Sequence, residues 1–275
     1  MIADPPYFCD VYSSFDLVKK YFSYYFHASN SQGHGMHSPF VFDFILHVLN
    51  NQSNYSAPVE VEELRKRYLS DPERLKVVDM GAGSRTRSGE EKSVSEIAHS
   101  ALKNKKYARL MYRLVRHYQP SEILELGTSL GVTTAYLARA NPGGKVSTIE
   151  GNPFIRKKAV EGFQSLSLGN IESLEGNFDR ELPLLLSKKN KIDLAYIDGN
   201  HKKEPTLTYF GEILEKTHDH SILVFDDIHW SREMEEAWEE IKNHPAVQYT
   251  IDIFFLGFVF FRKEFKVKQH FSIRF

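Results

Sequence analysis

From residue 120 onward, short apolar runs alternate with longer segments in which apolar residues recur at helical spacing. This alternation predicts an α/β fold with a doubly wound, mostly parallel sheet and helices on both of its faces. In the last of the longer segments, Met234, Ala237, Trp238 and Ile241 share one helix face, which we expect to pack on the sheet. We expect strands near 122–127, 145–150, 171–175, 192–198 and 221–226, and helices near 130–140, 153–167, 178–188, 203–217 and 231–243.

The chain before residue 120 has a different pattern. Helical candidates lie at about 13–27, 39–50 and 58–70, and a long candidate helix runs from Ser93 to Tyr118. Aromatic residues are dense here, which suits a helical cap that packs on itself and on the core. A more specific alternative is that this region forms a substrate lid or a dimer surface. We therefore divide the chain into an N-terminal helical cap, residues 1–116, and a core, residues 117–275.

Residues 123–151 read as a strand, a glycine turn, a helix and a second strand that ends in a carboxylate. The run Ile123–Leu126 is short enough for a buried parallel strand. Gly127 and Gly131 allow a ligand to approach the backbone closely. Glu150 follows a β-branched strand, where a carboxylate can accept two hydrogen bonds from a ribose diol. The segment predicts a nucleoside-binding site.

The spacing of the glycines decides against a dinucleotide. A dinucleotide site needs G-x-G-x-x-G, so that a pyrophosphate can lie on a helix N-terminus. Here the turn reads E-L-G-T-S-L-G, with Thr128 and Ser129 between the glycines and Glu125 before them. A carboxylate there would repel a pyrophosphate but suits a cationic cofactor that carries an amino acid. An NAD-dependent oxidoreductase is accordingly disfavoured.

This turn resembles motif I of S-adenosylmethionine (SAM)-dependent methyltransferases. The runs 117–127 and 148–153 are similar to the catechol O-methyltransferase group in particular. The resemblance implies a Rossmann-like sheet with one antiparallel strand near the C-terminus, for which the runs Val247–Ile253 and Phe254–Phe261 are available. It also implies a cofactor-binding set, with Asn177 and Phe178 near the adenine: Glu125, Gly127, Thr128, Ser129, Gly131, Glu150, Gly151, Asn177, Phe178 and Asp198.

Two later strands also end in acids. One ends at Asp198, and the other ends at Asp226 and Asp227. Carboxyl ends of neighbouring parallel strands meet at one edge of the sheet, where ligands of open α/β sheets bind. Three carboxylates brought together there would repel one another unless a cation lay between them. A hard divalent cation, Mg²⁺ or Mn²⁺, suits ligation by oxygen alone. The alternative is that Asp198 caps a helix and the other two only contact the cofactor.

The resemblance agrees with these ligands in part. In catechol-type enzymes the position of Asp198 supplies one metal ligand, and an Asp-Asn pair one strand later supplies two more. This chain has Asp226 and Asp227 instead, a version that resembles metal-dependent sugar O-methyltransferases. The family's general-base lysine lies three residues after the first ligand, where this chain has His201, with Lys202 one residue further on. Which of the two removes a proton is open, so Asp198, His201 and Lys202 are the catalytic candidates.

Composition restricts the partners. The 275 residues carry a net charge of −1, which gives no general attraction to nucleic acid or to acidic membranes. The lone Cys9 excludes an internal disulfide and suits a reducing compartment, and no apolar run is long enough to span a membrane, so we expect a cytoplasmic protein. Family members are often dimers, which implies a possible homodimer.

We expect transfer of a methyl group from SAM to a hydroxyl of a small molecule, helped by a divalent cation. Two alternatives stay open: a metal-independent methyltransferase that acts on RNA or protein, and a SAM-binding module without turnover. A second acid-glycine stretch, Val77–Ser84, is interpreted as a decoy loop. Charged residues follow it in place of a helix packed on a sheet, and no second strand that ends in an acid comes within the next 30 residues.

Overall fold

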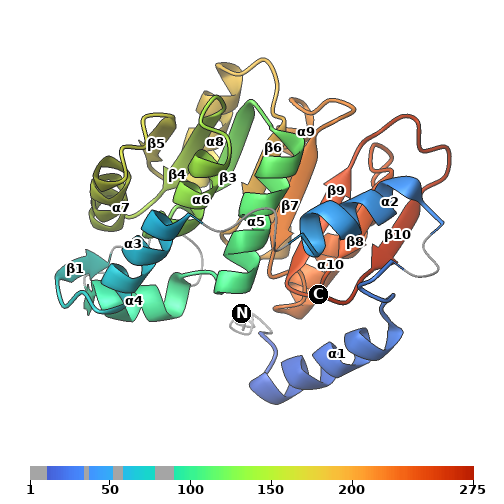
Figure 1. The fold of residues 1–275 in the computed structure, drawn as a ribbon, viewed down its shortest axis with the longest axis horizontal. Coiled ribbons are helices and arrows are strands. Elements are labelled where there is room, and N and C mark those ends of the chain that lie inside the picture. The colour runs from blue at the N-terminus through green and yellow to red at the C-terminus, as the bar shows by residue number, and fades with distance from the viewer. Residues whose placement is uncertain (1–10, 34–36, 52–57, 78–89) are drawn as a thin grey trace, which may run out of the picture.

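The structure is a computed structural model, and it describes residues 11–33, 37–51, 58–77 and 90–275. Its centre is an eight-stranded sheet with the order β10-β8-β9-β7-β6-β3-β4-β5 (Figure 1). The strands are β3 (Glu122–Leu126), β4 (Lys145–Glu150), β5 (Ile171–Glu175), β6 (Leu194–Ile197), β7 (Ile222–Asp226), β8 (Tyr249–Asp252), β9 (Leu256–Phe260) and β10 (Gln269–Ser272).

The strands from β3 to β7 all pair in parallel. Strand β9 is antiparallel to both of its neighbours, β7 and β8, while β10 joins β8 in parallel. Every residue of β6 and β9 is buried, as expected for strands that are covered by helices on both faces. The predicted fold class, a doubly wound and mostly parallel sheet with an antiparallel strand near the C-terminus, is confirmed.

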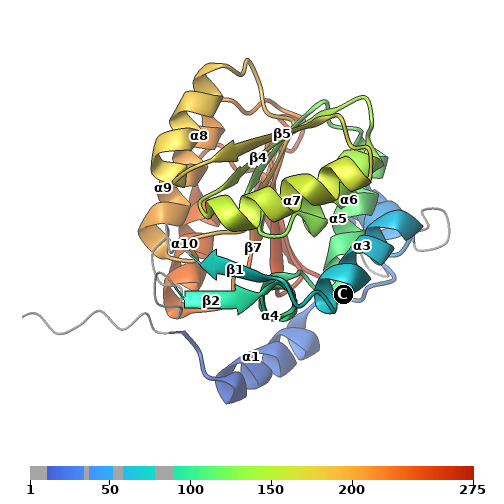
Figure 2. The ribbon, with the colours of Figure 1, turned by 90° about the vertical axis from the view of Figure 1, so that its left-hand side faces the viewer.

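Helices cover both faces of this sheet, as Figure 2 shows. On one face, Leu182, Tyr209 and Trp238 from three successive helices share a hydrophobic cluster with the strands. On the other face, Leu114 and Leu137 do the same. The helices concerned are α5 (Lys105–Tyr118) and α6 (Val132–Ala140) on the second face, and α8 (Phe178–Ser187), α9 (Lys203–Leu214) and α10 (Arg232–Asn243) on the first; α7 (Pro153–Ser165) connects β4 to β5.

The N-terminal region is helical, as predicted. Phe44 from this region packs in one cluster with Leu114 of α5 and Ile123 of β3, so segments on both sides of residue 116 share a core. The division into residues 1–116 and 117–275 stays a prediction. The elements are α1 (Ser14–His27), α2 (Pro39–Phe44), the π-helix η1 (Ile45–Leu49), α3 (Val59–Leu69) and α4 (Val94–Ala101).

The long helix predicted from Ser93 to Tyr118 is wrong in one respect, because it is broken into α4 and α5. The side chain of Asn104 accepts a hydrogen bond from the backbone N–H of Lys106 and begins α5 as its N-cap. An asparagine that bonds to nearby backbone competes with a continuous helix. Residues 102–104 therefore form a short connection, whose position becomes important at the cavity described below.

A small antiparallel sheet was not predicted. It consists of β1 (Arg74–Val77) and β2 (Glu90–Ser93), whose charged residues read as loop in the sequence. The rest of the decoy loop, up to Ser84, lies outside the described residues, as does Cys9. None of the helices in the described ranges has the length and apolar content needed to cross a bilayer.

Two glycines test the packing of this fold. A Cβ on Gly257 of β9 would lie 2.6 Å from the ring of Trp238, whereas one on Gly211, exposed in α9, would meet nothing within 4 Å. We expect Gly257→Ala to destabilise the protein by about 1–3 kcal/mol through overpacking. Gly211→Ala should stabilise it by about 0.5–1 kcal/mol through helix propensity. Urea unfolding of the pair measures both; equal stabilities would contradict the contact between α10 and β9.

Candidate functional site

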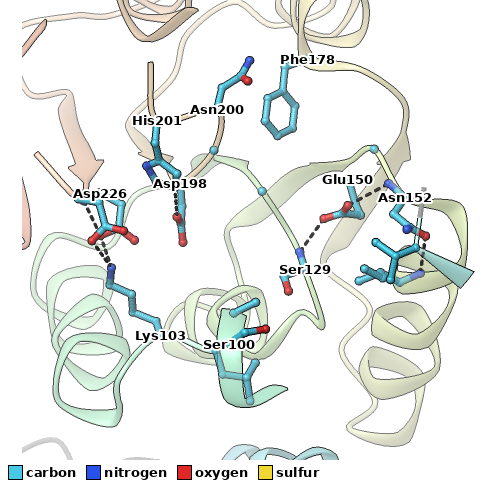
Figure 3. Close-up of a pocket in the computed structure, with 18 of the residues that line it drawn as sticks. Ser100, Lys103, Ser129, Glu150, Asn152, Phe178, Asp198, Asn200, His201 and Asp226 are labelled. Carbon is cyan, nitrogen blue, oxygen red and sulfur yellow. Dashed lines mark hydrogen bonds and ion pairs between the residues drawn. The ribbon is translucent and has the colours of Figure 1, made fainter. Parts of the chain in front are cut away.

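A cavity of about 760 Å³ opens at the carboxyl ends of the central strands. It is lined on one side by the ends of β4 and β5, at its floor by the turn after β3, and on the other side by the ends of β6 and β7 together with the connection between α4 and α5 (Figure 3). The predicted site residues that line it are Gly127, Ser129, Glu150, Gly151, Asn177, Phe178, Asp198, His201, Asp226 and Asp227.

Gly127 sets the floor of the cavity. Its φ of +97° lies in the region that favours glycine, and a Cβ there would lie 1.9 Å from the carbonyl oxygen of Asp198. The ends of β3 and β6 can therefore approach each other only without a side chain at this position. This close approach leaves the backbone of the turn bare toward the cavity.

Glu150 joins the end of β4 to the glycine turn. One of its carboxylate oxygens accepts a hydrogen bond of 2.8 Å from the backbone N–H of Ser129, and the other accepts one of 2.9 Å from that of Asn152 (Figure 3). Burial raises the pKa of Glu150, and these backbone hydrogen bonds oppose the rise. Each oxygen keeps a further lone pair, so the side chain can still accept from a ligand diol.

Three residues of the predicted cofactor set do not line the cavity: Glu125, Thr128 and Gly131. Glu125 is fully buried behind the turn, where one carboxylate oxygen accepts from the hydroxyls of Thr134 and Thr148. The sequence could not distinguish an acid that faces the ligand from one that supports the turn from behind. Glu125 and Thr128 are both buried and do not line the cavity.

Phe178 and Asn177 lie at the cavity as the resemblance implied. Asn177 is the N-cap of α8, where its side chain accepts from the backbone N–H of Asp179. The ring of Phe178 lies edge-on to Tyr209 at 5.8 Å and contacts the backbone region of Gly199. An apolar ring at this point suits the flat face of a nucleobase.

The carboxylates of Asp198 and Asp226 share a buried partner. The hydroxyl of Tyr196 lies 2.7 Å from Asp226 and 3.0 Å from Asp198. His201 lies 3.5 Å from the other oxygen of Asp198. Burial opposes the charge on both members of this pair, but their attraction wins: the pKa of Asp198 falls to about 2 and that of His201 rises to about 9. His201 is therefore an imidazolium at neutral pH in this arrangement.

Lys103, which the sequence analysis missed, supplies the cation at this edge. Its ammonium contacts a carboxylate oxygen of Asp226 directly and lies 3.5 Å from Asp227 (Figure 3). Burial alone would lower the pKa of Lys103, but the neighbouring carboxylates raise it above its usual range. Conversely, burial and Asp198 raise the pKa of Asp226, and Lys103 opposes that rise. The only signal in the sequence was Asn104, a helix-capping residue inside the predicted helix.

The predicted metal ligands Asp198, Asp226 and Asp227 therefore need correction, because the ammonium of Lys103 already lies beside two of these carboxylates. Lys103 and Tyr196 already occupy the two oxygens of Asp226. An ammonium at the centre of the group would repel an incoming cation. Lys202 is corrected as well: it is the N-cap residue of α9 and does not line the cavity.

Within the described ranges, one group of side chains is close enough to share an ion, and it lies elsewhere. It consists of Asp43, His47 and His117, at the far end of α5 from the cavity. Both imidazoles pair with the carboxylate of Asp43, at 2.8 and 3.0 Å. This group has no connection with the predicted site.

Comparisons with known proteins agree with this geometry. Residues 124–228 match a family described as a methyltransferase domain. A catechol O-methyltransferase from Niastella koreensis is 28% identical over 146 residues, which are 52% of this chain and 62% of the relative. A tRNA (guanine-N(7)-)-methyltransferase from Mycoplasma mobile is 31% identical over 90 residues, or 32% of this chain and 45% of the relative. The chain thus spans about half the length of these curated relatives.

Among solved structures, an O-methyltransferase from Bacillus cereus in complex with SAH shares the fold with a TM-score of 0.57 at 18% identity, over 78% of this chain and 96% of that one. The sheet order and the cavity at its carboxyl edge frame residues 124–228, the part of the chain that matches a methyltransferase domain. Over about half of its length, the chain is similar to an O-methyltransferase.

Glu125 gives this site a measurable pH dependence. Burial raises its pKa to about 8, although the two threonine hydroxyls oppose the rise. Because the folded state binds the proton more tightly than the unfolded state, stability should fall as pH rises from about 5 to about 8, with this residue contributing up to about 1.4 kcal/mol per pH unit. Urea unfolding across this range should show that component lost in Glu125→Gln. An unchanged slope in the variant would mean that Glu125 is ionised throughout.

Proposed function

We propose that this protein transfers the methyl group of SAM to a hydroxyl of a small molecule. The S–CH₃ bond of the sulfonium breaks, an O–CH₃ bond forms, and the hydroxyl proton leaves to a base or to water. The products are SAH and a methyl ether. The observation that carries the proposal is one continuous cavity that joins the diol-binding carboxylate of Glu150 to the charged cluster around Asp198.

The cofactor would lie along the first part of this cavity. Its ribose hydroxyls would donate to Glu150, its base would lie beside Phe178, and its amino-acid part would contact the bare backbone of the turn at Gly127. The sulfonium would then point toward Asp198. Negative carboxylates near a sulfonium stabilise its charge while the methyl group is positioned for transfer.

The acceptor would occupy the other side, against Lys103, Tyr107 and Phe255. Tyr107 and Phe255 meet edge-to-face, with ring centroids 5.5 Å apart, and form an apolar wall beside the charged cluster. A cavity of this volume suits a cofactor and a compact acceptor. The net charge of −1 does not favour a nucleic-acid acceptor. No step of this proposal passes through a metal, since the ammonium of Lys103 lies among the carboxylates that would hold one.

Calorimetric titration of SAM into the purified protein tests the cofactor assignment. We expect Glu150→Ala to weaken binding about 10- to 100-fold, because it removes charge-assisted hydrogen bonds. Glu175→Ala is the matched control: Glu175 is the register partner of Glu150 at the end of β5, but it does not line the cavity. Equal affinity in both variants would contradict a ribose role for Glu150.

Turnover is tested separately with methyl-labelled SAM and a panel of small phenols and alcohols. Label recovered in a methyl ether supports the proposal. Binding of SAM without transfer to any hydroxyl, but with transfer to RNA or protein, would overturn the acceptor class. Binding without any transfer would favour a SAM-binding module without turnover.

A further inference from the structure

We propose that Lys103 occupies the place that a divalent cation would take among the three carboxylates, so that this site works without a metal. The inference rests on the proposed methyl transfer, and it names the group that carries positive charge to the acceptor. It departs from the expectation drawn from the sequence, which placed a metal ion at Asp198, Asp226 and Asp227. The argument is geometric and starts from the backbone that holds Lys103.

The backbone of Lys103 is fixed on both sides. Its carbonyl accepts a hydrogen bond of 2.8 Å from the buried guanidinium of Arg65 in α3. The preceding residue, Leu102, closes α4 through its N–H, and the following residue, Asn104, caps α5. The lysine therefore starts from a rigid connection, and only 13% of its side chain is exposed. It is positioned as a permanent member of the site.

Both oxygens of Asp226 already have partners. One oxygen accepts from the ammonium of Lys103 and, at 2.8 Å, from the backbone N–H of Asp227. The other accepts from Tyr196. Asp226 is almost completely buried, at 1% exposure, so any charge on its carboxyl group depends on these partners. A hard cation that needs six or more oxygens would have to displace the lysine and leave a buried ammonium unpaired.

The ammonium also faces the cavity. A lysine has three N–H donors, and Asp226 and Asp227 account for two directions. The third can be donated to the oxygen of an acceptor hydroxyl. A positive charge there lowers the pKa of the hydroxyl and stabilises the oxygen anion as its proton leaves. A bound metal cation would give the same electrostatic stabilisation. The proton itself goes to solvent or to a neighbouring base, and the lysine keeps its own.

The first test measures metal binding and does not depend on activity. Mn²⁺ is titrated into the full-length protein, and the free Mn²⁺ signal is followed by electron paramagnetic resonance. All proteins carry Asp43→Asn, which removes the separate Asp43, His47 and His117 group. We expect no binding at millimolar Mn²⁺ by the otherwise unchanged protein or by Lys103→Arg. Lys103→Ala should gain one site, and Asp226→Asn in that background should lose it.

Two results would overturn the inference. One is stoichiometric Mn²⁺ binding by the protein with Lys103 intact that disappears with Asp226→Asn, since the lysine would then yield to the metal. The other is a Lys103→Ala protein that gains no site, because Lys103 would then not fill a cation position. Neither result bears on SAM binding, which is measured by calorimetry on the same samples.

The second test concerns the reaction. With an accepted substrate, methyl transfer should be unchanged by a chelator, and Lys103→Met should lower kcat about 100-fold or more, with SAM affinity unchanged. Lys103→Arg should recover part of the loss, because it restores the charge. A chelator that abolishes transfer would overturn the inference while leaving the methyltransferase assignment intact. Absence of SAM binding would instead overturn the proposed function and leave the Mn²⁺ result standing.

Discussion

Burying carboxylates at one edge of a sheet is the constraint on which this site depends. Parallel strands bring Asp198 and Asp226 to neighbouring ends, and burial would force one of them to become neutral unless positive charge lay nearby. The protein supplies that charge from its own side chains, Lys103 and His201. Lys103 and His201 thus lie beside the three carboxylates at this edge. The charged groups at this edge therefore affect both the stability of the fold and the kind of ligand that can bind there.

The acids at strand ends differ in their pKa shifts and in their access to the cavity, because their surroundings differ. Glu150 receives two backbone N–H groups at the surface of the cavity, so it can bind a diol. Glu125 lies on the next strand but behind the turn, where it accepts hydrogen bonds from two threonine hydroxyls and where burial raises its pKa. Asp193, at the other edge of the sheet, pairs with Lys191 and His218 and has its pKa lowered. Of these three acids, only Glu150 lines the cavity at the carboxyl ends of the strands.

The sequence predicted what is local in this structure. The run from Ile123 to Glu150 contains its own strand, turn, helix and strand, so its pattern identified the fold class and the position of the cavity. The pairing of Asp226 with Lys103 spans 123 positions, and no spacing rule connects them. The sequence did not reveal the break between α4 and α5 that places Lys103 at the cavity, because the residues on both sides of the break have helical periodicity. Only Asn104 marked the break, and one capping residue is weak against that periodicity.

The N-terminal helices therefore contribute residues to the cavity at the edge of the core sheet. The ends of the core strands line most of the cavity, but Lys103 and Tyr107, on the side that we propose for the acceptor, come from the connection between α4 and α5 and from the first turn of α5. Arg65 in α3 fixes that connection, so a change in how α3 packs would move the ammonium relative to Asp226. The glycine turn after β3 and the acids at the ends of β6 and β7 can stay the same in a protein in which the connection between α4 and α5 is different. The identity of the acceptor should then vary with the cap, whereas the cofactor stays the same.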